Sequence, residues 1–146
     1  MGECMSAIHH TTITFEMAHR CIGFGYGEDS IHGHTWTLTT HVRSSDPYDM
    51  HALQVEFDRA KEIVQTNVAD IFDRSFMVAE QDDLYDFYQQ LKANDHNIYM
   101  MNFVPTAQNI ANYLFTELEG LFREAGLHLS GLILSEGDVG EVKVGE

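Results

Sequence analysis

The sequence predicts an α+β fold in which a four-stranded antiparallel sheet carries two helices on one face. Alternating segments at both ends of the chain enclose two segments of helical periodicity, so the expected order is strand, strand, helix, helix, strand, strand. A chain of 146 residues with 44% hydrophobic residues and only two prolines suffices for one core. We therefore expect a single domain over residues 1–146.

The first two strands are separated by a glycine-rich loop. From Ile8 to His19, β-branched and aromatic residues alternate with polar ones, which is typical of a half-buried strand. The next stretch, RCIGFGYGEDS, has three glycines and no period, which predicts a loop. From His32 the text HGHTWTLTTHV alternates again, with Trp36 and Leu38 on one face and threonines on the other.

The helices and the last strands follow. Apolar residues at intervals of three and four predict the first helix: Leu53, Phe57, Ala60, Val64, Val68 and Ile71. A second helix starts after Pro105 with Thr106 as N-cap and ends before Gly126. The acidic, aromatic segment between them suggests a short helix and an extended piece near residues 98–103. GLHLSGLILSEGD and VGEVKVGE predict two short strands around a Gly-Asp turn.

Charge and composition exclude several classes of partner. Eight basic residues against twenty-three acidic ones give a net charge of −15, which repels nucleic acid and anionic membranes. The opening MGECMS fits a short myristoylation pattern at Gly2 and Ser6, but so acidic a chain is a poor membrane partner. Two cysteines, with no signal peptide and no long apolar run, favour a cytoplasmic protein without disulfides.

Four strands cannot close a barrel within one chain. The outer strands would leave unpaired edges, and one sheet face is rich in threonine. Both features favour an oligomer in which several chains complete a barrel.

Three histidines form a candidate metal site. His32 and His34 are two residues apart in a strand, so their rings leave the same face, and His19 ends the neighbouring strand. Three imidazoles leave one tetrahedral position open, as in catalytic zinc sites, although copper and nickel also accept such ligands. The alternative is that His32 and His34 are only polar residues at the end of a loop.

Six blocks resemble, in order and spacing, motifs of the 6-pyruvoyl-tetrahydropterin and 6-carboxytetrahydropterin synthases. They are ITFEMAHR, IHGHTW, VEFDRAKEIV, IFDRSFMV, VPTAQNIANYLF and LILSEGD. The resemblance implies the tunnelling fold, assembled into trimeric barrels and hexamers. It also implies that His19, His32 and His34 bind zinc and that a pterin binds between subunits.

By the same resemblance, Glu136 would anchor the pterin and Thr106 would assist. A carboxylate offers two acceptors to the paired N–H donors of a 2-amino-4-oxopyrimidine. The alternatives are a solvated turn acid at Glu136 and a plain N-cap at Thr106. Gln108 stands where many relatives carry glutamate.

Two catalytic positions differ from the usual family pattern. Glu28 stands in place of the catalytic cysteine, four residues before His32. Asp73 matches the family's aspartate, but Arg74 replaces the histidine that relays protons, and a guanidinium cannot act as a base. Cys21 has two alternative interpretations: a thiol that replaces the missing cysteine, and a small buried residue.

Two hypotheses follow. In the first, the protein is a zinc enzyme in which Glu28 acts as base and breaks a carbon–carbon bond in the side chain of dihydroneopterin or its triphosphate. A family subgroup with glutamate at this position makes 6-hydroxymethyl-dihydropterin for folate synthesis. In the second, the protein binds zinc and a pterin but is catalytically degenerate, a reading that Arg74 favours.

Overall fold

The computed structural model describes residues 7–25, 27–46 and 48–146. Its two longest strands, β1 (Ile8–His19) and β2 (His32–Arg43), pair antiparallel along their whole length. They agree with the strands predicted from alternation, and His19 pairs with His32 in the register. Gly2, Cys4 and Ser6 lie outside the described residues.

The last two strands complete the predicted antiparallel set. β5 (His128–Glu136) pairs with β2 and places Glu136 opposite Trp36, and β6 (Gly140–Gly145) pairs with β5. The turn between them contains the expected Gly-Asp pair, with Gly137 at a φ of +54° that favours glycine.

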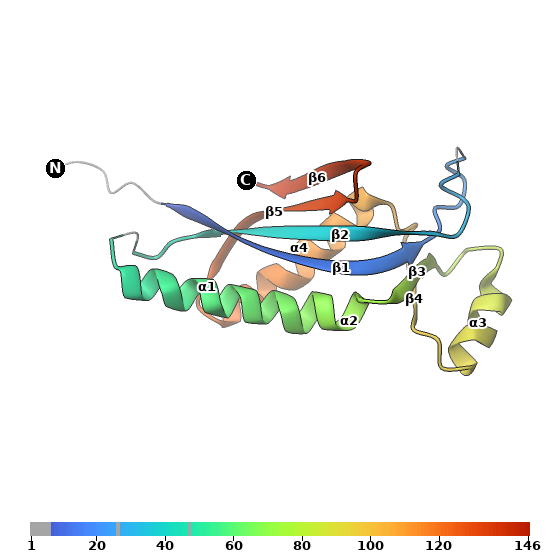
Figure 1. The fold of residues 1–146 in the computed structure, drawn as a ribbon, viewed down its shortest axis with the longest axis horizontal. Helices are drawn as coiled ribbons and strands as arrows, with labels where there is room; N and C mark the ends of the chain where they lie inside the picture. The colour runs from blue at the N-terminus through green and yellow to red at the C-terminus, as the bar shows by residue number, and fades with distance from the viewer. Residues whose placement is uncertain (1–6, 26, 47) are drawn as a thin grey trace.

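Two long helical segments cover one face of this sheet (Figure 1). α1 (Met50–Val64) lies along β1, and α4 (Ala107–Glu124) packs on β5 and against α1. Thr106 caps α4 as predicted, because its hydroxyl accepts the backbone N–H of Asn109 at 3.2 Å. The core between helices and sheet includes Phe15, Trp36, Leu38, Leu114, Leu118 and Leu134.

The first helical segment departs from the predicted regular stripe. A π-helical turn, η1 (Gln65–Ala69), follows α1, and a short α2 (Asp70–Phe72) ends the segment. The wider turn shifts the buried face by one residue, so Phe72 is buried whereas Ile71, predicted to be in the stripe, is 37% exposed. The amide of Asn67 supports this turn by donating to the Ile63 carbonyl at 2.8 Å.

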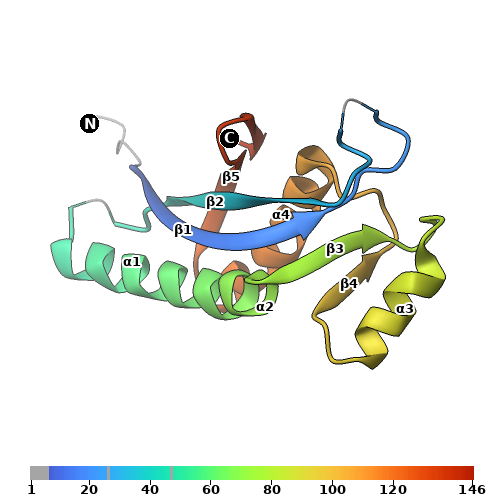
Figure 2. The same ribbon diagram turned by 45° about the vertical axis from the view of Figure 1, so that its right-hand side comes forward.

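A strand–helix–strand unit extends the sheet beyond the four predicted strands. β3 (Ser75–Ala79) runs parallel to the end of β1, and β4 (Ile98–Met101) runs parallel to β3. α3 (Tyr85–Ala93) joins them and lies beside them, at the end of the molecule away from the start of α1 (Figure 2). The sheet therefore has six strands in the order β4-β3-β1-β2-β5-β6, and the predicted count of four was incomplete.

The face of the sheet opposite the helices is polar. Thr12, Thr14 and Thr35 are exposed, and the hydroxyls of Thr12 and Thr39 lie 3.0 Å apart across β1 and β2. Among the described residues, no helix is both long enough and apolar enough to cross a membrane.

Candidate metal centre

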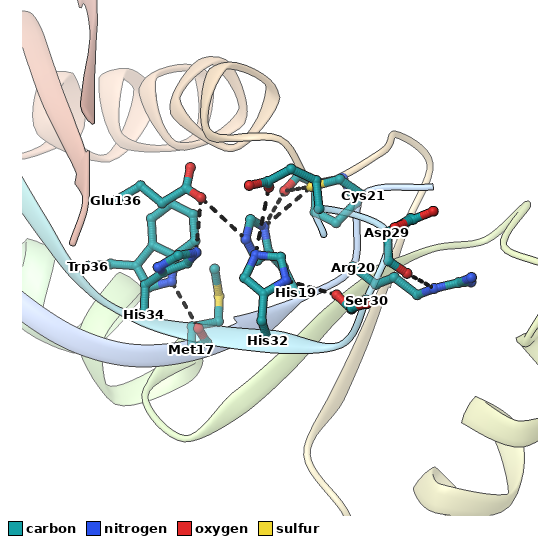
Figure 3. A network of polar contacts seen from close by, with 12 residues as sticks. Met17, His19, Arg20, Cys21, Asp29, Ser30, His32, His34, Trp36 and Glu136 are labelled. Carbon is teal, nitrogen blue, oxygen red and sulfur yellow. Dashed lines mark hydrogen bonds and ion pairs between the residues drawn. The ribbon is translucent and has the colours of Figure 1, made fainter. Parts of the chain in front are cut away.

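Three histidine rings meet where β1 ends and β2 begins. Register pairing brings His19 opposite His32, and His34 follows on the same face of β2. The ring centroid of His19 lies 4.4 Å from that of His32 and 5.2 Å from that of His34. The ring centroids of His32 and His34 are 4.9 Å apart. Figure 3 shows the three rings pointing toward one another. The structure thus brings together the three predicted ligands.

Backbone carbonyls orient two of these rings. Nδ1 of His19 lies 2.8 Å from the carbonyl oxygen of Pro105, and Nδ1 of His32 lies 2.8 Å from that of Ser30. When Nδ1–H donates to a carbonyl, Nε2 keeps its lone pair for a metal ion. Within the described part of the chain, the Nε2 atoms of all three histidines are buried, and the polar groups near them are the carboxylates of Glu28 and Glu136.

Glu136 adds a carboxylate to the same point. It is the last residue of β5, is 8% exposed, and directs Oε1 to 3.0 Å from Nε2 of His34 and 3.5 Å from Nε2 of His19. One ligand atom from each of the three histidines and Glu136 lies within 4.8 Å of the others. Three imidazoles with converging Nε2 atoms and a buried carboxylate fit a divalent transition metal such as zinc.

The ionisation of these groups reflects their crowding. Burial lowers the pKa of His19, but hydrogen bonds with the Cys21 thiol, the Glu136 carboxylate and a backbone carbonyl outweigh it and raise the pKa to about 10. Burial lowers the pKa of His34, and the hydrogen bond with His19 holds the pKa of Glu136 below its usual range. A proton and a metal ion therefore compete for Nε2 of His19.

Trp36 forms one wall of the site, a role that alternation alone did not reveal. Its ring lies edge-on to those of His19 and His34, with centroids 5.1 and 5.6 Å apart, and it is fully buried. The indole N–H donates to the carbonyl of Met17 at 3.0 Å, which fixes the plane of the ring.

Glu28 lies at the open side of the histidines. Its Oε2 is 3.6 Å from Nε2 of His32, and its side chain is 40% exposed. Cys21 is buried, with Sγ 3.6 Å from Nδ1 of His19 and 3.5 Å from the Pro105 carbonyl. Glu28, Cys21 and His19 each offer a ligand atom within 4.8 Å of the others. The side chain of Glu28 is thus more accessible to an incoming molecule than those of His32 and His34, which are 25% and 15% exposed.

The remaining predicted residues lie at different distances from this centre. Thr106 follows Pro105, whose carbonyl contacts His19, so the start of α4 adjoins the site. The carboxylate of Asp73 accepts the backbone N–H of Glu16 at 2.8 Å. Asp73 also lines a cavity of about 450 Å³, and none of the three histidines is among the lining residues of this cavity. Within one chain, Asp73 is therefore not brought to the metal centre.

Arg74 has an unusual backbone and an exposed side chain. Its φ is +60°, a left-handed backbone conformation that residues other than glycine rarely adopt. Its backbone N–H donates to the Glu16 carbonyl at 2.6 Å. The guanidinium is 88% exposed, with Asp73 at 3.9 Å.

Fold and site together define a class: a tunnelling-fold protein with a buried group of three histidines and one carboxylate. A family model described as 6-pyruvoyl tetrahydropterin synthase matches residues 8–145. A 6-carboxy-5,6,7,8-tetrahydropterin synthase of Rickettsia felis is 30% identical over 125 residues, covering 85% of this chain and 89% of the relative. One of Rickettsia conorii is 28% identical over 106 residues, with coverages of 73% and 75%. The chain belongs to the 6-pyruvoyl tetrahydropterin synthase family.

Solved structures agree with this assignment of the fold. An uncharacterized protein of Wolinella succinogenes has a TM-score of 0.75 at 15% identity, covering 98% of this chain and 99% of its own. A Plasmodium vivax 6-pyruvoyltetrahydropterin synthase, in a variant whose catalytic glutamate is changed to alanine, has a TM-score of 0.70 at 16% identity, with the same coverages. The chain is a tetrahydropterin synthase-like protein with the tunnelling fold.

Proposed function

We propose that this protein is a zinc-dependent carbon–carbon lyase that acts on the side chain of a reduced neopterin, with Glu28 as the catalytic base. The observation that carries the proposal is the position of Glu28. An exposed carboxylate lies 3.6 Å from Nε2 of His32, at the edge of a buried group of ligand atoms. A base and a Lewis acid side by side are what removal of a hydroxyl proton requires.

The three histidines would hold the ion, and the Glu136 carboxylate lies beside it. Imidazole ligands suit zinc, which has no redox demands, and a bound zinc ion supplies polarisation of a substrate oxygen. The carbonyls of Pro105 and Ser30 keep Nε2 of His19 and His32 directed at the ion position.

Glu28 would remove the proton from the second hydroxyl of the neopterin side chain. The second side-chain carbon, which bears this hydroxyl, then becomes a carbonyl carbon, and its bond to the first side-chain carbon breaks. The electron pair of the broken bond is taken up by the C=N bond of the pterin ring. A proton returns to the first side-chain carbon, which leaves a hydroxymethyl group on the pterin and an aldehyde as the second product. The relative from Plasmodium vivax supports this role, because a glutamate is a catalytic residue in that enzyme.

Glu136 and the start of α4 would bind the pterin ring. The Glu136 carboxylate can accept an N–H group of the pyrimidine, and Thr106 lies at a helix start where backbone N–H groups are free to donate. Because Glu136 also contacts His19 and His34, we infer that one of its oxygens faces the metal position and the other is available to the pterin.

Asp73 would act from a neighbouring subunit. It contacts the backbone of Glu16 in β1 and lines a cavity that the histidines of its own chain do not line. We infer that trimers or hexamers close this face and complete the site between subunits, as the family resemblance implies.

A second candidate function is favoured by Arg74. A guanidinium stays protonated and cannot relay protons, so a chain with arginine at this position could bind zinc and a pterin without turning it over. The Arg74 side chain is 88% exposed, and the carboxylate of Asp73 lies 3.9 Å from its Nε.

One experiment separates the two functions. Zinc-loaded protein is incubated with dihydroneopterin and, separately, with its triphosphate, and the products are identified by mass spectrometry. We expect 6-hydroxymethyl-dihydropterin together with a two-carbon aldehyde, and no product from protein stripped of metal. Tight binding of both pterins without any product would establish the binding function instead.

A further inference from the structure

The loop that carries Glu28 is rich in glycine and contains short-range backbone hydrogen bonds, from the N–H of Glu28 to the carbonyl of Gly25 at 3.0 Å and from Ser30 to Gly27 at 3.1 Å. Gly23, Gly25 and Gly27 all have positive φ angles, and a Cβ atom added to any of them would meet nothing within 4 Å. These three glycines therefore have open space around them, and they give the backbone conformational freedom. Hydrogen bonds from residues next to β1 add to those within the loop and hold Glu28 beside the candidate metal centre.

Two consecutive residues at the end of β1 supply such contacts. The backbone N–H of Cys21 donates to the carbonyl of Glu28 at 2.8 Å, and Nε of Arg20 donates to the carbonyl of Asp29 at 2.6 Å. Figure 3 shows the guanidinium of Arg20 reaching Asp29. Cys21 uses its backbone for this contact, whereas Arg20 uses its side chain. The contact from Arg20 can therefore hold the loop only if the guanidinium is itself fixed in place.

A buried carboxylate fixes that guanidinium. Nη1 of Arg20 lies 2.5 Å from Oδ1 of Asp82 and 2.8 Å from Oδ1 of Asp83. The side chain of Asp82 is fully buried, whereas that of Asp83 is 78% exposed. Charge-assisted hydrogen bonds shielded from water are much stronger than exposed ones, so Asp82 is the main partner.

Asp82 in turn belongs to the strand–helix–strand unit. Its Oδ1 accepts the backbone N–H of Leu84 at 2.9 Å, and its Oδ2 accepts the hydroxyl of Tyr88 in α3 at 2.9 Å. Burial and this hydrogen bond raise the pKa of Tyr88 to about 12, so the hydroxyl stays a donor. Tyr88 is fully buried against Val78 and Ile98 of the flanking strands.

We propose that Arg20 is a positioning residue through which the strand–helix–strand unit, residues 75–101, holds Glu28 beside the metal centre. A continuous series of contacts leads from α3 through Tyr88, Asp82 and Arg20 to the backbone next to Glu28. The consequence for turnover rests on the proposed function of Glu28 as base, whereas the restraint on the loop does not.

The test is Arg20→Lys in the zinc-loaded protein, because lysine keeps the charge near Asp82 but lacks the Nε–H that binds Asp29. Arg59→Lys is the matched control, since Arg59 also donates to a backbone carbonyl, that of Ala125, at 3.1 Å. Hydrogen exchange of residues 21–31 should become about tenfold faster in Arg20→Lys and stay unchanged in Arg59→Lys. Turnover should fall by about tenfold, with KM and zinc content unchanged.

Equal exchange in the parent and in Arg20→Lys would overturn the proposal, and so would faster exchange with undiminished turnover. A parent that converts neither pterin refutes the proposed function instead, while the exchange result still decides whether Arg20 restrains the loop. If Arg20→Lys does not fold, Tyr88→Phe serves in its place. It removes the hydroxyl from Oδ2 of Asp82 and should speed exchange in the same residues.

Discussion

Two of the three histidines at the metal centre are oriented by carbonyls that the sequence does not associate with them. Strand alternation and hairpin pairing were enough to predict that His19, His32 and His34 converge. The carbonyl of Pro105, which orients His19, lies 86 residues further along the chain. Only the packing of α4 on the sheet brings it there. The convergence of the three rings was thus predictable from local periodicity, whereas the distant carbonyl that orients His19 was not.

His34→Ala should lose most of the bound metal. The parent is expected to hold about one zinc per chain, and removing one of three imidazoles leaves too few ligands to retain it. Metal content after dialysis measures this, with His96→Ala as control because His96 is exposed and far along the chain. Full zinc retention in His34→Ala would refute the metal centre.

Glu136→Gln should weaken pterin binding by about ten- to a hundredfold, because one charge-assisted acceptor is lost. Zinc should remain, since three imidazoles suffice to hold it. Titration with a pterin, alongside metal analysis, checks both, with the exposed Glu141→Gln as control. Unchanged pterin affinity would make Glu136 a turn residue, and loss of zinc as well would make it an essential metal ligand.

At the scale of elements, the sequence predicted the segments whose pattern is regular. β1 and β2 alternate over 12 residues each, and α4 carries a long apolar stripe between a threonine cap and a glycine. β3 was missed because SFMVA is a short apolar run without alternation, which does not distinguish a buried strand from a helix. The π-helical turn was missed because a regular spacing was assumed through Val68.

The end of the sheet opposite the metal centre is joined to α1 by a buried carboxylate. Glu56 in α1 accepts the backbone N–H of Ser45 at 3.1 Å and its hydroxyl, and lies 3.2 Å from Nε2 of His9 in β1. Burial raises the pKa of Glu56, but the bonds from Ser45 and His9 outweigh it and hold the pKa below the usual range. Ionised Glu56 therefore stabilises the folded state.

Glu56→Gln should lower the free energy of unfolding by about 1–3 kcal/mol near neutral pH. The Glu56 carboxyl binds a proton less readily in the folded state than in the unfolded state. Its contribution to the free energy of unfolding is therefore complete above the ordinary pKa of 4.5. It disappears as the pH falls through the lower folded value. Urea unfolding of parent and variant across this range tests the sign, with exposed Glu62→Gln as control. A difference that does not shrink in acid would contradict this account.

At the scale of the whole molecule, one chain leaves its sheet half covered. The helices bury one face, while the threonine-rich face and the edges at β4 and β6 have no partner element within the described residues. We expect a trimer or a hexamer, because assembly would cover both. Light scattering at micromolar concentration measures the mass directly. A monomer would argue against the barrel and against a site shared between subunits.

The most direct test of the proposed chemistry is the turnover of Glu28→Gln, measured with zinc content and pterin affinity on the same preparation. Glutamine keeps the shape of the side chain but cannot accept the proton. Turnover should therefore fall by about a hundredfold or more, while zinc and pterin binding stay at the parent level. If Glu28→Gln converts the pterin as fast as the parent with zinc bound, Glu28 is not the base and the proposed mechanism is wrong.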